Sequence, residues 1–180
     1  MFSEKLISLL QTFTKPELNR FRKNLQSPYL NDQAEALILF DLIDQSMRKG
    51  QEKVDQLTKE AVWQKMFAPK PYNDAILRRL ASDLSGMARH FWSMEYRKQD
   101  PLAEALDLQW HMGKPELQKH LSSLERQIER QLGEQEGKSS WAYFNEFRYH
   151  WNIFERASRS MTSSGYADKL TAADQALERF

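Results

Sequence analysis

The 180-residue chain carries 26 basic and 25 acidic side chains, and its net charge of +1 provides no overall field to attract nucleic acid, a membrane or an acidic substrate. It contains no cysteine, which excludes disulfides, thiolate catalysis and cysteine-ligated zinc or iron–sulfur sites and agrees with a reducing compartment. Six glycines and six prolines are few for this length, which favours long helices and predicts an all-α protein.

The N-terminal segment MFSEKLISLLQTF predicts a short first helix capped by Ser3, not an export signal. Its apolar run LISLL is shorter than the core of a signal peptide, and Glu4 interrupts the approach to it. No apolar stretch elsewhere approaches the roughly 20 residues that span a bilayer. We therefore expect a soluble, cytoplasmic protein with no membrane partner.

A capping box marks the start of the second helix. In TKPE, residues 14–17, Thr14 and Glu17 have the spacing of reciprocal capping partners, and Pro16 lies in the first turn. This helix should run to about Gln26.

The third helix is predicted over AEALILFDLIDQSMRK, closed by Gly50. SPYLN, residues 27–31, breaks the preceding helix because a residue before proline disfavours the α region, and Asn31 is a candidate N-cap for the new one. The apolar residues spread round most of this helix and are Ile38, Leu39, Phe40, Leu42, Ile43 and Met47. We expect a polar wedge near Asp41 and Asp44.

Two further helices complete a predicted five-helix bundle over residues 1–99. Thr58 can cap the fourth, TKEAVWQKMF, which APKP terminates. The fifth should run from near Asn73 to about Lys98. Its apolar stripe is Ile76, Leu77, Leu80, Ala81, Leu84, Met87, Ala88, Phe91 and Trp92.

Asp100-Pro101 is an N-cap followed by proline at the first helical position, and we place the main boundary there. Residues 100–180 then predict two antiparallel helical hairpins in a tetratricopeptide-like or α-solenoid-like array. The first hairpin pairs residues 101–112, closed by Gly113, with residues 115–136, closed by Gly137, and the second pairs about 140–161 with about 166–180.

The final segment TAADQALERF begins at Thr171, a candidate cap, and stops without a C-terminal glycine or a polar tail. A solenoid needs a polar terminal cap to cover its last apolar face. We therefore expect this chain to be the N-terminal piece of a longer protein.

Residues 141–158, WAYFNEFRYHWNIFERAS, are dense in aromatic rings at helical spacing, which we interpret as core packing. The apolar face is Phe144, Phe147, Trp151 and Phe154, extended by Tyr143, His150, Ala157 and Met161, and the polar face is Asn145, Arg148, Asn152, Arg156 and Arg159. Two rings, Trp141 and Tyr149, escape the packing face and are candidate partner-binding residues, because such amphipathic rings are frequent at interface hot spots. A further hairpin in a longer chain would explain them equally well.

Catalysis and metal binding have little support. The four histidines are scattered over different expected helices, without an HxxxH, HExxH or ExxH pair. There is no GxSxG motif and no glycine-rich phosphate loop. Glu146 and His150 share a helix face, but such pairs are commonly surface contacts. We expect no catalytic residue, no metal, no cofactor and no enzymatic activity.

Nucleic-acid binding is the alternative function. Residues 58–85 resemble a helix-turn-helix, although the turn is longer than usual and Asp74 and Asp83 dilute the charge of its second helix. The candidate nucleic-acid-binding residues are Arg20, Arg22, Lys23, Arg78, Arg79 and Arg89.

The strings FRKNLQSPYLN and LTKEAVWQKMFAPKPYNDAILRRLASDL resemble the N-terminal region of uncharacterised helical proteins of Bacteroidota-type bacteria. A Ser-Pro-Tyr-Phe-Asn turn and a Leu-Thr-Lys-Glu helix recur among members of that family. In this chain Leu30 stands where Phe is usual. The resemblance covers about residues 13–95, and FNEFRYHW is similar to a later helix of the family. It implies a helical architecture and a longer chain, and it transfers no catalytic residue.

The sequence thus predicts a non-catalytic protein-interaction or scaffold module with a protein partner, because stacked hairpins present an extended groove. A nucleic-acid-associated regulator acting through residues 58–85 is the second hypothesis. The identity of the partner and the oligomeric state are left open.

Overall fold

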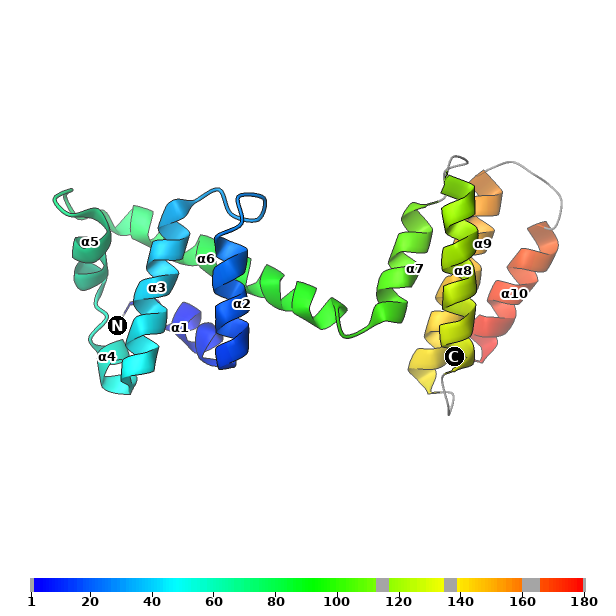
Figure 1. Cartoon of the computed structure of the whole chain (residues 1–180), viewed down its shortest axis with the longest axis horizontal. Helices are drawn as coiled ribbons and strands as arrows, with labels where there is room; N and C mark the ends of the chain where they lie inside the picture. Colours follow the sequence, from blue (N-terminus) through cyan, green and yellow to red (C-terminus); the bar gives the residue numbers. More distant parts are fainter. Residues whose placement is uncertain (1, 113–116, 135–138, 160–165, 180) are drawn as a thin grey trace. The chain divides into compact units, whose positions relative to one another are not determined.

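The computed structural model describes residues 2–112, 117–134, 139–159 and 166–179. Over these ranges the chain forms ten α-helices and no β-strand, which confirms the all-α prediction (Figure 1). None of the helices described combines the length and the apolarity that a membrane span requires. Contacts divide the chain into two compact units, Met1–Glu95 and Tyr96–Phe180, so the division falls slightly before the expected boundary at Asp100.

Unit 1 holds the five expected helices and a short sixth one. Its helices are α1 Glu4–Gln11, α2 Lys15–Leu25, α3 Ala34–Lys49, α4 Gln51–Asp55, α5 Lys59–Phe67 and α6 Asp74–Arg97, of which the last two residues, Tyr96 and Arg97, fall in unit 2. The unexpected helix is α4, which starts directly after Gly50. Gly50 has a φ of 107°, a value that glycine adopts without strain, so the chain can leave α3 and begin a new helix at once.

Three predicted N-caps are confirmed by their hydrogen bonds. The Thr14 hydroxyl accepts from the Glu17 amide, and the Glu17 carboxylate accepts from the Thr14 amide at 2.7 Å, which completes the capping box. The Thr58 hydroxyl accepts from the Ala61 amide at 3.2 Å. Asp100 accepts from the amide of the third residue after it, at 2.9 Å.

The cap predictions for Asn31 and Thr171 are wrong, and the one for Ser3 is confirmed in position only. Ser3 is the N-cap residue of α1, but its side chain forms no cap hydrogen bond. Asn31 lies two residues before the N-cap Gln33; it accepts from the Gln33 amide and donates to the Leu25 carbonyl at 2.8 Å, so it fixes the turn instead. Thr171 lies inside a helix and donates to a carbonyl of the preceding turn.

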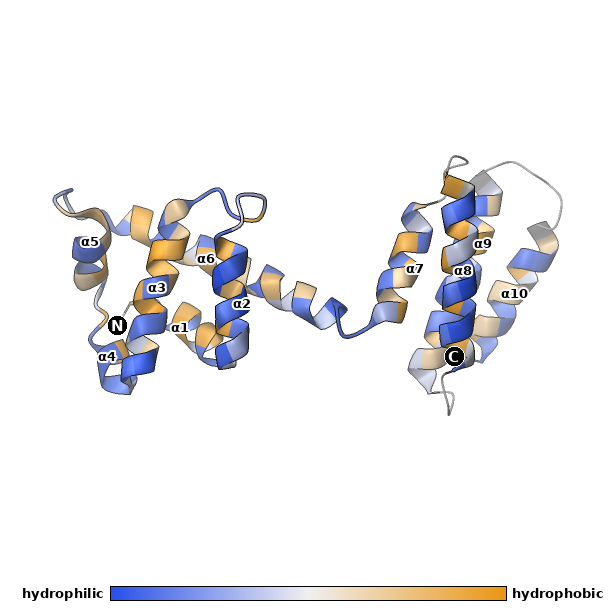
Figure 2. Ribbon diagram, in the orientation of Figure 1, coloured by the Kyte–Doolittle hydropathy of each residue, from blue (hydrophilic) through white to orange (hydrophobic). Residues whose placement is uncertain are grey.

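The core of unit 1 collects apolar side chains from all six helices. Its centre is a set of phenylalanines from α2, α3 and α6, where the Phe21 ring lies 5.1 Å from Phe40 and 5.3 Å from Phe91 between centroids. Figure 2 shows the hydrophobic run in the first half of α3 and the more polar second half. Ile76 and Trp92, expected on the packing face of α6, are 49% and 45% exposed.

The expected polar wedge of α3 is divided between solvent and interior. Asp44 is only 1% exposed, and its carboxylate accepts 3.0 Å hydrogen bonds from Arg22 of α2 and from Arg48. Asp41 stays partly exposed and pairs with Arg22 at 2.9 Å. Buried carboxylates are tolerated when they are paired in this way, and this one ties α2 to α3.

Unit 2 contains α7 Pro101–His111, α8 Gln118–Gly133, α9 Ser140–Arg159 and α10 Tyr166–Glu178. Successive helices run in alternating directions (Figure 1). The helix α7 packs against both α8 and α9, and α9 packs against α10. The expected closing glycines at 113 and 137, the helix start at 115 and the residue at 161 lie outside the described ranges.

Candidate interaction surfaces

The helix α9 presents its polar face, not its aromatic face, to α7 and α8. Asn152 donates to the Leu106 carbonyl at 2.9 Å and to the Gln109 side chain at 3.0 Å, while Arg156 pairs with Glu125 at 2.6 Å. The predicted orientation of α9 is therefore only partly correct: Phe154 and Ala157 of the expected apolar face are buried, but the expected polar face is internal as well, and Trp151 is 39% exposed. The polar groups of α9 can be internal because α7 and α8 supply acceptors for them.

These contacts form a continuous network across three helices. Gln109, 1% exposed, donates to Glu125 at 3.2 Å, so the Asn152–Gln109–Glu125–Arg156 chain joins α9 to α7 and α8. Asn145 is the exception on this face: it is 0% exposed, and its amide group forms no hydrogen bond within the described part of the chain.

Tyr149 belongs to this internal face and is only 6% exposed. Its hydroxyl donates to Glu129 of α8 at 2.6 Å. Burial, followed by the hydrogen bond to Glu129, raises the pKa of the phenol above its ordinary value, so it stays protonated. The prediction that Tyr149 offers its ring at the surface is wrong, because the ring lies between helices.

Trp141, the other predicted partner-binding ring, is 53% exposed and belongs to a larger surface. We name this surface the aromatic strip and define it as Trp110 of α7 with Trp141, Phe144, Phe147 and Trp151 of α9. Trp151 is 39% and Trp110 is 38% exposed. The ring centroids of Trp141 and Phe144 are 5.4 Å apart, and those of Phe147 and Trp151 are 5.9 Å apart.

A hollow of about 310 Å³ lies between α7 and α9 and is lined by three rings of this strip, Trp110, Phe147 and Trp151. Its apolar walls are Leu106, Trp110, Phe147 and Trp151, and Asp107, His111, Arg148 and Asn152 complete the lining. Arg148 pairs with Asp107 at 2.7 Å, and Arg97 also pairs with Asp107. Because these charges are already paired, the hollow offers mainly ring surface to a partner. Sequence periodicity assigned Phe144, Phe147 and Trp151 to a packing face and placed Trp141 outside it, and it did not single out Trp110.

A second hollow in unit 2, of about 380 Å³, contains ionisable groups beside α8 and α9. It is lined in part by Glu129, Glu146, Tyr149 and His150. Burial lowers the pKa of His150, with Glu146 acting in the opposite direction. Among the described residues, no group of three or more histidines and carboxylates is arranged to hold a metal ion.

The candidate nucleic-acid-binding residues of α2 differ in whether their charge is already paired. Arg20 pairs with Glu95 at 2.6 Å, and Arg22 pairs with Asp41 and with the buried Asp44. Lys23 is exposed and forms no ion pair with any described residue.

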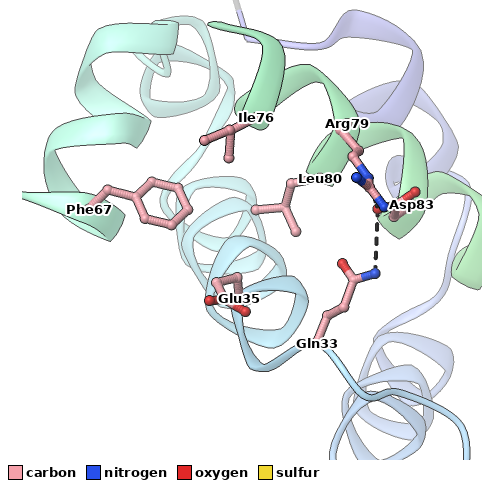
Figure 3. Close-up of a pocket in the computed structure, with 7 residues that line it drawn as sticks. All are labelled: Gln33, Glu35, Phe67, Ile76, Arg79, Leu80 and Asp83. Atoms are coloured by element: carbon pink, nitrogen blue, oxygen red, sulfur yellow. Dashed lines mark hydrogen bonds and ion pairs between the residues drawn. The ribbon is translucent and has the colours of Figure 1, made fainter. Parts of the chain in front are cut away.

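Those of α6 point to two different surfaces. Arg78, which pairs with Asp74, and Arg89 line one groove beside α1. Arg79 lies instead over a hollow of about 320 Å³ that includes Leu80 and Phe67. Figure 3 shows its guanidinium beside Asp83, to which Gln33 also donates. The structure therefore does not bring Arg78 and Arg79 together on one face.

Comparison of the chain with protein-family models, with curated proteins and with solved structures finds no match.

Proposed function

We propose that the chain is a non-catalytic protein-interaction module that binds a protein partner through the aromatic strip. The observation that carries this proposal is the exposure of three indoles, Trp110, Trp141 and Trp151, on two adjoining helices. Exposed apolar surface can mark interaction sites, and tryptophan is enriched among the residues that dominate binding free energy. Trp110 and Trp151 line the same hollow. The absence of cysteine favours action in the cytoplasm.

The contacts on the inner face of α9 also support the proposal, because they hold the helix in a defined position. On this face of α9, Arg156 pairs with Glu125 and Asn152 donates to Gln109. These contacts hold the backbone that carries the exposed rings in place. A preorganised binding surface loses less conformational entropy when a partner docks.

We also propose that α7 with α8 and α9 with α10 are stacked hairpins of the tetratricopeptide-like or α-solenoid-like kind. The packing of α9 against α7, α8 and α10 supports this, because each hairpin of a solenoid contacts its neighbour along the chain. In such an array the aromatic strip would be part of one extended surface.

Nucleic-acid binding through residues 58–85 remains a second and weaker hypothesis. Arg20, Arg22 and Arg78 already pair with carboxylates, and Arg79 lies 3.8 Å from Asp83, which reduces the charge available to phosphates. If it were correct, affinity for mixed-sequence DNA would fall steeply with salt.

The test places a photo-crosslinking amino acid at position 141 or 151 of the full chain, in cells that make the protein. We expect both positions to capture the same partner, and a crosslinker at Tyr29, which is 93% exposed on unit 1, not to capture it. The purified partner should then bind Trp151→Ala and Trp110→Ala at least about tenfold more weakly than the unchanged chain.

Tyr96→Ala is the matched control, because Tyr96 is 74% exposed in unit 2 but lies outside the strip. Equal affinity of the partner for Trp151→Ala, Trp110→Ala and Tyr96→Ala would overturn the proposal.

A further inference from the structure

A groove of about 640 Å³ lies on unit 1, between α1 and α6. Its floor is apolar and consists of Phe2, Leu9, Leu77 and Ala81. Four cations line it: Lys5 of α1, Lys59 of α5, and Arg78 and Arg89 of α6. We name it the basic groove. It is separate from the aromatic strip, which belongs to unit 2.

The charges of the basic groove do not cancel. Its lining contains four cations and two carboxylates, Glu4 and Asp74, so four minus two leaves a net charge of +2. Asp74 is already shared, because Lys59 pairs with it at 2.9 Å and Arg78 also pairs with it. Lys5 and Arg89 are exposed, and their side chains have no hydrogen-bond or ion-pair partner among the described residues.

The spacing of the cations along α6 sets the size of a matching ligand. Arg78 and Arg89 are eleven residues apart, which is about 16 Å along the axis at about 1.5 Å per residue. Eleven residues also complete about three turns, so the two side chains share a face. A partner helix with carboxylates at the same separation would place one near each arginine.

The centre of the groove is shaped for close approach. Between the two arginines the groove face of α6 carries only small side chains, Ala81, Ser82 and Ser85. Ser85 donates its hydroxyl to the Ala81 carbonyl, which satisfies it within the helix. An aliphatic side chain from a ligand could therefore cover Ser85 without leaving its hydroxyl unpaired.

We propose that the basic groove binds a helical segment of a partner protein whose contacting face is aliphatic in the middle and acidic at both ends. The net charge of +2 complements the acidic ends, and the apolar floor complements the aliphatic centre. This is the helix-in-groove mode of peptide recognition.

These features favour a peptide over a nucleic acid. Phosphate backbones are bound by cations and polar groups, and their affinity grows with the number of phosphates neutralised. Here Lys59 and Arg78, two of the four cations, already pair with Asp74, and the floor of the basic groove is apolar.

The test measures binding of the full chain to two synthetic helical peptides of the same composition by fluorescence anisotropy. The first carries glutamates eleven residues apart with two leucines between them on the same face, and the second carries the glutamates on the opposite face. We expect the first peptide to bind with a Kd of roughly 10–100 µM and the second to bind about tenfold more weakly.

Variants of the chain locate the site. Lys5→Glu combined with Arg89→Glu should weaken the first peptide about tenfold or more, because two attractions become repulsions. Lys23→Glu is the matched control, since Lys23 is exposed on α2 outside the groove, and it should bind as the unchanged chain does. Ser82→Trp, at an exposed position of the groove, should block the peptide while helical circular dichroism is retained.

The proposal is overturned by any of three results. These are equal binding of the two peptides or binding of neither, unchanged affinity of the double variant or of Ser82→Trp, and tighter binding of mixed-sequence duplex DNA that displaces the first peptide. None of these variants touches the aromatic strip, so failure here leaves the function proposed for unit 2 standing.

Discussion

The phenol of Tyr149 donates a 2.6 Å hydrogen bond to the carboxylate of Glu129. This bond joins α9, which carries four rings of the aromatic strip, to α8. Only 6% of Tyr149 is exposed. This bond is one of the contacts that set which side of α9 faces inward, so the exposure of Trp141 and Trp151 depends on the opposite face of the same helix.

We expect Tyr149→Phe to lower the free energy of unfolding of unit 2 by about 1 kcal/mol. The loss is smaller than is usual for a bond to a charged group because Glu129 is an exposed residue and can be hydrated when its partner is removed. Urea unfolding measures it, with Tyr96→Phe, an exposed tyrosine of the same unit, as the control. Equal midpoints for the two variants would contradict the role of the bond.

The same phenol should make stability depend on alkaline pH. Its pKa is raised in the folded chain, chiefly by burial, so the unfolded chain loses this proton first, above about pH 10. The stabilising contribution is complete below that pH and is lost as the pH rises toward the folded pKa. Unfolding free energies measured between about pH 9 and pH 11 should therefore fall more steeply for the unchanged chain than for Tyr149→Phe, and parallel curves would exclude this linkage.

Asp44 should matter more to unit 1 than its neighbour Asp41. Asp44→Asn removes the charge that two arginines share at 3.0 Å in the interior, and we expect a loss of about 1–3 kcal/mol in unfolding free energy. Arg22 and Arg48 are partly exposed, which keeps the loss below that of a fully buried pair. Asp41→Asn is the matched control and should cost less than about 1 kcal/mol, as measured by chemical denaturation. A larger loss for Asp41→Asn would reverse this ranking.

Local signals in the sequence located most helix ends, and the failure at Thr171 has a physical cause. Thr14 and Thr58 cap helices because each has its amide partner three residues on. Thr171 has the same sequence signature but lies inside α10, where its hydroxyl bonds back to the Ala167 carbonyl. The sequence signature of a cap does not show whether the helix has already begun before that residue. At Thr171 it has, because α10 starts at Tyr166.

The candidate surface was harder to predict for a reason of longer range. Helical spacing separates the two faces of α9 correctly, but it does not say which face meets another helix. That depends on acceptors distant in the chain, namely Gln109 for Asn152 and Glu125 for Arg156. Since the polar face finds these partners, the aromatic face is left partly in solvent, where the proposed function requires it.

Thr58→Ala should destabilise unit 1 by about 1 kcal/mol, because the cap hydrogen bond to the Ala61 amide is lost. Thr171→Ala should change the stability of unit 2 by less than about 0.5 kcal/mol or raise it, since alanine is the better helix former at an interior position. Thermal unfolding of both variants compares the two positions directly. A larger loss for Thr171→Ala would mean that it, and not Thr58, has the capping role.

Replacing Asn145 by an apolar residue should stabilise the protein. Asn145 is 0% exposed, and neither amide atom has a hydrogen-bond partner within the described residues, so its desolvation is not offset. Leucine has a similar size and no polar atoms, and Asn145→Leu should raise the unfolding free energy by about 1 kcal/mol or more. A loss of stability in urea unfolding would contradict this expectation.

His150 should make unit 2 sensitive to mild acid. Burial lowers its pKa in the folded chain; Glu146 and Glu129 act in the opposite direction, and Arg179 adds to the lowering. A histidine with a lowered folded pKa contributes stability above its unfolded pKa, near 6.5, and this contribution is lost as the pH falls, because the unfolded chain binds the proton more readily. His150→Gln should therefore lose less unfolding free energy between about pH 7.5 and pH 5.5 than the unchanged chain does. His120→Gln, at an exposed position of α8, should keep the acid sensitivity of the unchanged chain, and the opposite ranking of the two variants would assign that sensitivity to His120.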